Sequence, residues 1–80
     1  MTMQELAELI ATDEPLLRFH NIDYQILFVQ GRCLIAIDND EATHTWFDNM
    51  HELLSNWTPD GVPIAEAVTD MKRIWYADLN

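Results

Sequence analysis

The part of the sequence that decides the fold is residues 24–37, which read YQILFVQGRCLIAI. Two apolar runs, residues 24–29 and residues 33–37, lie on either side of the polar break QGR. A short break that contains glycine, between two apolar runs, is typical of a β-hairpin. We therefore predict an antiparallel pair of strands. Because both faces of the first strand are largely apolar, we expect it to lie centrally in a sheet, with helices covering at least one face.

The residues before this hairpin predict a short helix and a further strand. Thr2 and Glu5 form a capping box, in which each side chain can bond the backbone N–H group of the other residue. The apolar residues that follow recur at helical spacing, namely Met3, Leu6, Ala7 and Ile10. The helix must end before Pro15, because proline disfavours helical geometry at the residue before it. Residues 17–19 (LRF) could then add an edge strand, with residues 21–23 (NID) turning the chain.

The residues after the hairpin predict two helices. Asp38 followed by Glu41 resembles a capping box with Asp in the cap position. The helix that begins there would carry an apolar stripe of Trp46, Phe47, Met50, Leu53, Leu54 and Trp57. After a turn at residues 58–61, which include Pro and Gly, a third helix begins near Pro63. Its apolar stripe would be Ile64, Ala67, Val68, Met71 and Trp75.

Together these patterns predict a single α+β domain over residues 1–80. The predicted order is αβ(β)βαα, with a short N-terminal helix, a two- to three-stranded antiparallel sheet and two C-terminal helices. We expect the second helix to pack against the hairpin through Trp46, Met50 and Leu53.

The charge of the chain is its strongest clue to function. It has 14 acidic residues and 4 basic ones, which give a formal net charge of −10 at pH 7. Such a surface repels nucleic acid and anionic membrane, so neither is expected as a partner, whereas a basic protein is. The alternative is that the acids serve solubility alone.

No pattern in the sequence indicates a catalytic site. Cys33 is the single cysteine, which excludes an intrachain disulfide and favours a reducing, intracellular compartment. It lies in an apolar strand without an activating base, so we expect a buried structural thiol. There is no Gly-rich phosphate loop and no nucleophile motif. The polar first residues do not resemble a signal peptide, and no apolar run approaches the roughly 20 residues of a membrane span.

Two arrangements superficially suggest a metal. Residues 38–41 (DNDE) lack the glycine and the later ligand spacing of a calcium loop, and helix capping explains them better. His44, Asp48 and His51 would share one face of the second helix, but nothing suggests a fourth ligand. We therefore predict no metal, no cofactor and no enzymatic activity.

The acids also pair with one another along the predicted helices. Glu5 and Glu8 are three residues apart, and two further pairs, Asp48 with Glu52 and Glu66 with Asp70, are four apart. Like charges at these spacings destabilise a helix by about 0.2–0.5 kcal/mol per pair. Of the four basic residues, only the adjacent Lys72 and Arg73 could partly neutralise the last pair. This arrangement suggests a negative surface that is retained because it binds a partner. The alternative is an acidic face that is exposed to solvent and has no binding role.

Three segments also carry a family resemblance. Residues 70–74 read DMKRI and residues 78–80 read DLN. The second predicted helix contributes Trp46, Met50, Leu53 and Trp57, and the N-terminal part contributes Met3, Glu5, Leu6, Ile10 and Glu14. In these residues, and in its element order, acidity and size, the chain resembles the small anti-CRISPR proteins of phages and prophages that inhibit type II-A Cas9. The resemblance covers most of the chain except residues 16–30, where this chain is shorter.

The resemblance implies a DNA mimic that acts in the cytoplasm of a bacterial host. Members of that family occupy the cleft where guide-loaded Cas9 reads the PAM duplex, and they present carboxylates to its arginines. Arginine forks that recognise base acceptors or phosphates accept carboxylates equally well. Glu14 stands at the position of the acidic residue that follows the N-terminal helix in that family. Pro63 and Ile64 stand where the family has adjacent acids, and QGR at residues 30–32 stands where its hairpin loop is rich in Asn and acids.

We therefore expect eight carboxylates to contact Cas9 or another basic nucleic-acid-binding protein. The main group is Asp13, Glu14, Asp60, Glu66 and Asp70, and a second patch is Asp38, Asp40 and Glu41. The alternative is a phage or bacterial assembly protein that self-associates through an aromatic stripe. The exposure of Trp46 and Trp75 distinguishes these two functions. A monomeric binding module buries these rings, whereas an assembly protein exposes them at a subunit contact.

Overall fold

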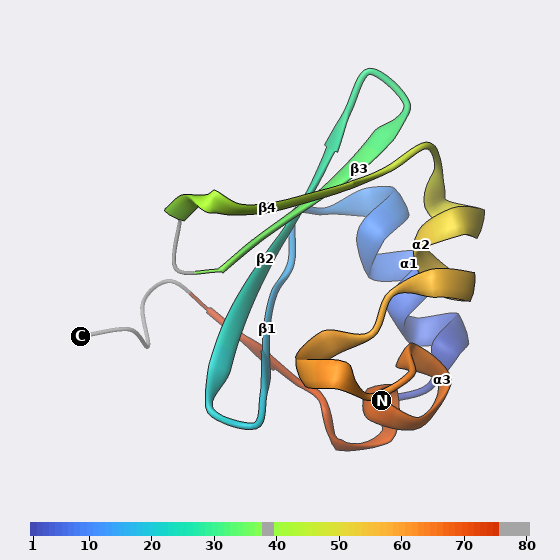
Figure 1. Ribbon diagram of the computed structural model, residues 1–80. Coiled ribbons are helices and arrows are strands. Elements are labelled where there is room, and N and C mark those ends of the chain that lie inside the picture. Colours follow the sequence, from blue (N-terminus) through green and yellow to red (C-terminus); the bar gives the residue numbers. More distant parts are fainter. Residues whose placement is uncertain (38–39, 76–80) are drawn as a thin grey trace.

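The computed structural model describes residues 1–37 and 40–75, apart from the side chains of residues 40–42 (Figure 1). The described part of the chain is an α+β domain. Its elements, in order, are α1 (Met3–Thr12), β1 (Leu16–Phe19), β2 (Ile22–Val29), β3 (Arg32–Ile37), β4 (Asp40–Phe47), α2 (Met50–Asn56), the 3₁₀ turn η1 (Pro59–Gly61), α3 (Ile64–Ala67), the 3₁₀ turn η2 (Val68–Asp70) and β5 (Lys72–Ile74).

The predicted hairpin is confirmed and forms the middle of the sheet. β2 and β3 pair antiparallel from Tyr24 opposite Ile37 to Val29 opposite Arg32. The two residues between them, Gln30 and Gly31, both have positive φ angles, of 51° and 81°. Two such residues form the turn whose twist matches that of the strands it joins. The strand order β4-β3-β2-β1-β5 places β2 at the centre, as its apolar faces predicted.

The N-terminal helix also follows the prediction. The Thr2 hydroxyl accepts a hydrogen bond from the Glu5 N–H group at 3.1 Å, and the Glu5 carboxylate accepts one from the Thr2 N–H group at 3.3 Å. Both halves of the capping box are therefore present. The helix buries Leu6 and Ile10 and ends at Thr12, before the proline.

Within residues 1–37 and 40–75 the sheet has five strands, which is more than the two or three predicted. Residues 72–74 form β5, which pairs antiparallel with β1, so β1 is an internal strand and not the expected edge. The turn between β1 and β2 consists of His20 and Asn21, and Ile22 already belongs to β2. No local pattern predicts β5, because three residues become a strand only by pairing with a distant partner.

The predicted second helix is wrong over residues 40–47, which form β4. This stretch contains Thr43, Thr45, Trp46 and Phe47, and β-branched and aromatic residues favour a pleated surface. The strand pairs with β3, with Thr45 opposite Ile35. The expected cap at Glu41 therefore cannot form, and Asp38 lies outside the described residues. Helix α2 is short, and it begins after Asn49, whose side chain accepts a hydrogen bond from the Glu52 N–H group at 2.9 Å.

The third helix begins after Pro63 as predicted but ends earlier than expected. Four residues of α3 pass directly into the 3₁₀ turn η2, which ends at Asp70. The first four residues of its predicted stripe are buried, namely Ile64, Ala67, Val68 and Met71. Trp75 lies beyond β5 and is 56% exposed, so it does not continue that stripe.

The core lies between the sheet and the helices, which gather on one side of it (Figure 1). The sheet contributes Leu17, Phe19, Tyr24, Ile26, Cys33 and Ile35, and the helical side contributes Leu6, Ile10, Leu53, Trp57, Ile64, Ala67, Val68 and Met71. Met50 and Leu53 pack into this core as predicted. Trp46 does not, because it lies opposite Leu34 on the other face of the sheet and is 43% exposed.

Candidate functional site

The carboxylates expected to bind a partner lie in separate places. Asp13 caps the C-terminal end of α1, and Glu14 follows it. Asp60 lies in η1, Glu66 in α3 and Asp70 in η2, and all of these residues are exposed. Asp40 and Glu41 belong to β4, but their side chains are outside the described part, as is the whole of Asp38.

Helix α1 separates Asp13 and Glu14 from Glu66 and Asp70. The Met1 amino group donates a hydrogen bond to the Val68 carbonyl at 3.2 Å, which places the start of α1 beside η2. The helix has ten residues and is therefore about 15 Å long. Asp13 and Glu14 lie at its far end, so the structure does not bring them together with Glu66 and Asp70.

Asp13 is already engaged within the domain. Arg73 donates a hydrogen bond to its carboxylate, and the same guanidinium lies 3.8 Å from the ring centroid of Trp75. The Arg73 hydrogen bond, helped by the Glu14 N–H group, lowers the pKa of Asp13 below its ordinary value of 3.8. A carboxylate held in this way is less available to an outside arginine than an unpaired one.

The Asp13 pair predicts a pH dependence with a definite sign. Because the pKa of Asp13 is lower in the folded chain, the pair stabilises the fold above about pH 3.8, and this contribution is lost as the pH falls through the lowered value. Replacing Arg73 by glutamine should raise the Asp13 midpoint toward 3.8, as measured by carboxyl carbon NMR. Lys72→Gln, at the exposed neighbouring position, should leave it unchanged. Identical midpoints in the wild-type and Arg73→Gln proteins would contradict the assignment.

The other described basic groups are engaged as well, with the exception of Lys72. Arg18 donates two hydrogen bonds to the Asp23 carboxylate, at 2.8 and 3.1 Å, and these raise the pKa of Arg18. The guanidinium of Arg32 lies 4.7 Å from the ring centroid of Trp46. In contrast, Glu66 and Asp70 have no ion-pair partner within residues 1–37 and 40–75. Of the five main carboxylates expected to bind a partner, Asp13 and Asp60 each contact a basic side chain, whereas Glu14, Glu66 and Asp70 have no ion pair with a described residue.

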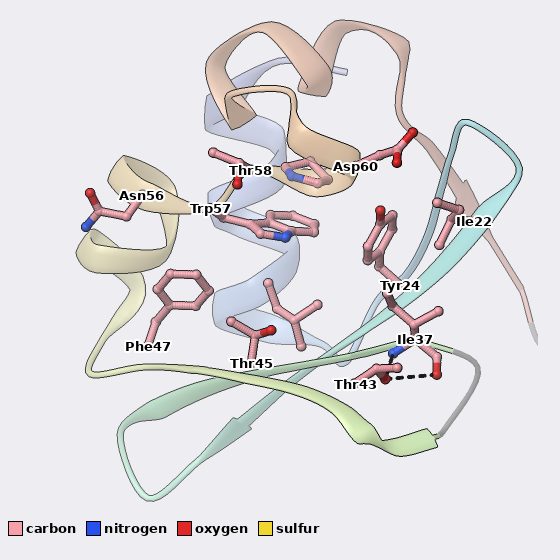
Figure 2. Close-up of a pocket in the computed structure, with 12 residues that line it drawn as sticks. Ile22, Tyr24, Ile37, Thr43, Thr45, Phe47, Asn56, Trp57, Thr58 and Asp60 are labelled. Carbon is pink, nitrogen blue, oxygen red and sulfur yellow. Dashed lines mark hydrogen bonds between the residues drawn. The ribbon is translucent and has the colours of Figure 1, made fainter.

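A pocket of about 360 Å³ lies between the sheet and the segment that joins α2 to η1 (Figure 2). Its walls are apolar and aromatic residues of the sheet together with Trp57, and its rim carries hydroxyl, amide and carboxylate groups. The lining residues are Ile22, Tyr24, Ile35, Ile37, Thr43, Thr45, Phe47, Asn56, Trp57, Thr58, Pro59 and Asp60. The sequence did not predict this pocket, because one wall belongs to β4, which the apolar spacing had assigned to a helix.

Asp60 joins the pocket to the predicted acidic surface. The Asp60 backbone lies beside the Tyr24 phenol, and the Asp60 carboxylate lies 2.9 Å from Nδ1 of His20. Burial, reinforced by the negative charge of Asp60, raises the pKa of Tyr24, so this phenol stays neutral at physiological pH. The Tyr24 ring meets Trp57 edge to face, with centroids 5.4 Å apart. Asp60 is thus a predicted contact residue that also lines this pocket.

The structure also places the residues considered for metal binding and catalysis. His44 lies on β4, Asp48 in the bend that follows and His51 on α2, so they do not share the helix face that their spacing suggested. Within the described residues, no group of three His, Cys, Asp or Glu side chains could hold a metal ion. Cys33 is fully buried as expected, and burial raises the pKa of its thiol.

None of the helices in the described part of the chain has the length and apolar character needed to span a membrane.

Comparison with known proteins found no relative. No family model matches the sequence, and the curated proteins and the solved structures gave no match either.

Proposed function

We propose that this protein is an acidic inhibitor that occupies the cationic DNA site of a nucleic-acid-handling protein, with guide-loaded Cas9 as the first partner to test. In this proposal it is encoded by a phage or prophage and acts in the cytoplasm of the bacterial host. The observation that carries the proposal is the charge balance of the folded chain. The net charge is −10, and Arg18, Arg32 and Arg73 are each engaged inside the domain.

The remaining carboxylates suit a partner built to hold DNA. Glu66 and Asp70 project from consecutive turns of the C-terminal helical segment, and both are exposed. An arginine fork that would otherwise bind a guanine edge or a phosphate can accept a carboxylate in the same geometry. The long-range field of a −10 protein would also speed its encounter with a basic cleft.

The experiment that tests this proposal is competition for DNA loading. Guide-loaded Cas9 proteins of several type II-A orthologues are immobilised, and binding of a PAM-containing duplex is followed by interferometry with and without this protein. We expect reduced DNA binding for at least one orthologue, and weaker inhibition as salt is raised, because exposed charges are screened. Unaltered DNA binding in every orthologue would remove Cas9 as the partner.

A second candidate function is self-association, and the exposed tryptophans favour it. The rings expected to be buried in a monomeric binding module are in fact exposed, by 43% for Trp46 and 56% for Trp75. Trp46 lies opposite Leu34, which pairs in turn with Leu27, on the sheet face that no helix of the described chain covers. Leu34 is buried and Leu27 is half-buried, so Trp46 is the exposed side chain of these three, and exposed aromatic side chains are typical of a subunit contact. The high negative charge of each copy opposes such a contact.

Sedimentation at increasing protein concentration separates the two functions. An assembly protein should form dimers or larger species, and Trp46→Lys should return these to monomers while leaving the fold intact, because the side chain is partly exposed. Trp75→Ser tests the other exposed ring separately, since Trp75 follows β5, which lies at the opposite edge of the sheet from β4. If the contact uses Trp46, this variant should still self-associate. A monomer at all concentrations would remove this second candidate.

A further inference from the structure

The pocket exists because the helices do not cover the whole inner face of the sheet. Thr45 lies opposite Ile35, and Phe47 lies opposite Cys33, so both side chains are on the helix-facing side of β4. Helix α2 has seven residues and ends at Asn56. It therefore leaves uncovered the part of the sheet where Ile37 of β3 and Thr43 of β4 line the pocket. The sheet is irregular here as well, since the β3–β4 register shifts between Ile35 and Ile37. The result is a cavity open to solvent and floored by the sheet.

Three aromatic rings line this cavity. Figure 2 shows Trp57 between Phe47 and Tyr24, with Thr45 beneath it on β4. Trp57 and Tyr24 are nearly perpendicular, at an interplanar angle of 80°. The faces of aromatic rings are negative, so they attract a cation that lies against them. The aromatic lining therefore favours a flat cationic group over a neutral polar one.

Asp60 adds a full negative charge at the mouth of the same cavity. Its backbone has φ 50° and ψ 36°, a left-handed conformation that Asp and Asn adopt more readily than other side chains. Oδ2 contacts His20, whereas Oδ1 has no hydrogen bond to any described residue. Of the residues that line the pocket in the described chain, Asp60 is the one with a charge, and none is basic. The cavity thus offers an aromatic wall and a carboxylate whose neighbouring base, His20, is bound through Oδ2 and lies outside the lining, which leaves Oδ1 as the acceptor.

An aromatic ring and a carboxylate already bind an arginine together elsewhere in this domain. The Arg73 guanidinium lies against the Trp75 ring, with 3.8 Å from its central carbon to the ring centroid, and donates to the Asp13 carboxylate. Arg32 likewise lies over Trp46. A guanidinium is planar and weakly hydrated, so it stacks on a ring and forks to a carboxylate at the same time. The pocket contains the same two kinds of group, with Trp57, which is 6% exposed, in its wall and Asp60 at its rim.

We propose that the pocket binds the side chain of an arginine from a partner protein, with the guanidinium against the aromatic wall and hydrogen-bonded to Asp60. The cavity of about 360 Å³ is near the lower end of the roughly 300–1,000 Å³ of ligand sites, which suits one side chain better than a folded element. The net charge of −10 attracts a cation and repels an anion such as a phosphate. This inference goes beyond the proposed function, because it needs neither Cas9 nor the carboxylates of α3 and η2.

The probe is a blocked tripeptide, acetyl-Gly-Arg-Gly-amide, titrated into the full chain and followed by NMR. We expect saturable shifts of the Trp57 indole, the Tyr24 ring and the Asp60 amide. The dissociation constant should be on the order of 1–10 mM, because a single side chain offers few interacting atoms. The same tripeptide with citrulline has the same shape without the charge and should bind at least about fivefold more weakly. Equal binding of the two peptides would overturn the proposal.

Two variants and one control locate the interaction. Asp60→Asn keeps a residue that tolerates the left-handed backbone and should weaken arginine binding at least about fivefold. Glu66→Gln removes the same charge outside the pocket and should change binding less than about twofold. Thr45→Trp places a large ring at an exposed strand position and should abolish binding by filling the cavity. Equal effects of Asp60→Asn and Glu66→Gln, or full binding by Thr45→Trp, would overturn the proposal whatever the outcome of the Cas9 experiment.

Discussion

Replacing Leu53 by alanine is expected to lower the free energy of unfolding by about 2–5 kcal/mol, the usual cost of a buried leucine. Leu53 is fully buried and is the one buried residue of α2. Its carbonyl accepts a hydrogen bond from the Trp57 N–H group at 3.0 Å, so loosening α2 also releases the residue that forms the pocket wall. Small domains are stable by only about 5–15 kcal/mol, so this variant should lose a large part of its total stability.

Chemical denaturation followed by tryptophan fluorescence measures this loss. Ser55→Ala is the matched control, because Ser55 lies on the exposed side of the same short helix and alanine is a better helix former. Its midpoint should stay the same or rise slightly. If Leu53→Ala lost less than about 1 kcal/mol, the position could not be the packing centre described above.

Replacing Glu66 by glutamine together with Asp70 by asparagine is expected to weaken partner binding by about 2–5 kcal/mol, without lowering the melting temperature. The fold should not suffer, because both side chains are exposed and have no ion-pair partner in the described chain. Binding should suffer strongly, because each neutralised carboxylate would leave an arginine of the partner buried and unpaired. Interferometry against any Cas9 orthologue that the DNA-loading experiment identifies as inhibited gives the binding change, and calorimetry gives the melting temperature.

The control for this double variant must remove two charges elsewhere. Glu5 is unsuitable, because its side chain completes the capping box of α1. Glu8→Gln with Glu52→Gln is suitable, since both residues are exposed on other helices. This control should weaken binding slightly, and the loss should fade with salt. Equal losses in the two double variants would mean that the partner responds to net charge and not to a specific acidic site.

The parts of the fold that local patterns control could be predicted from the sequence. The capping box of Thr2 and Glu5 is made by neighbours along the chain, and so is the end of α1 before Pro15. The hairpin could be predicted because the turn at Gln30 and Gly31 and the apolar strands beside it are contiguous. In each case the residues that determine the structure are close in sequence to the residues that adopt it.

The error at residues 40–47 has a different physical origin. Trp46, Phe47, Met50 and Leu53 have the spacing of an apolar helical stripe, although two of them belong to a strand and two to a helix. Backbone pairing with β3 decided between these structures, and periodicity within one segment contains no information about such pairing. The candidate site shows the same limit. The acids could be named from the sequence, but the engagement of Asp13 by Arg73 and the pocket beside Asp60 depend on contacts between distant segments.

The pairing of β5 with β1 has a consequence for the order in which the domain folds. Strands β1 to β4 are sequential neighbours, so each of their pairings closes a short loop, whereas Leu16 must find Ile74 across most of the chain. Closing a longer loop costs more chain entropy, and contacts between distant residues slow folding. The four-stranded meander should therefore form early, and β5 should dock last. Because Arg73 lies in β5, the Asp13 carboxylate acquires its partner only in that final step, so the acidic surface reaches its mature charge pattern when the sheet is complete.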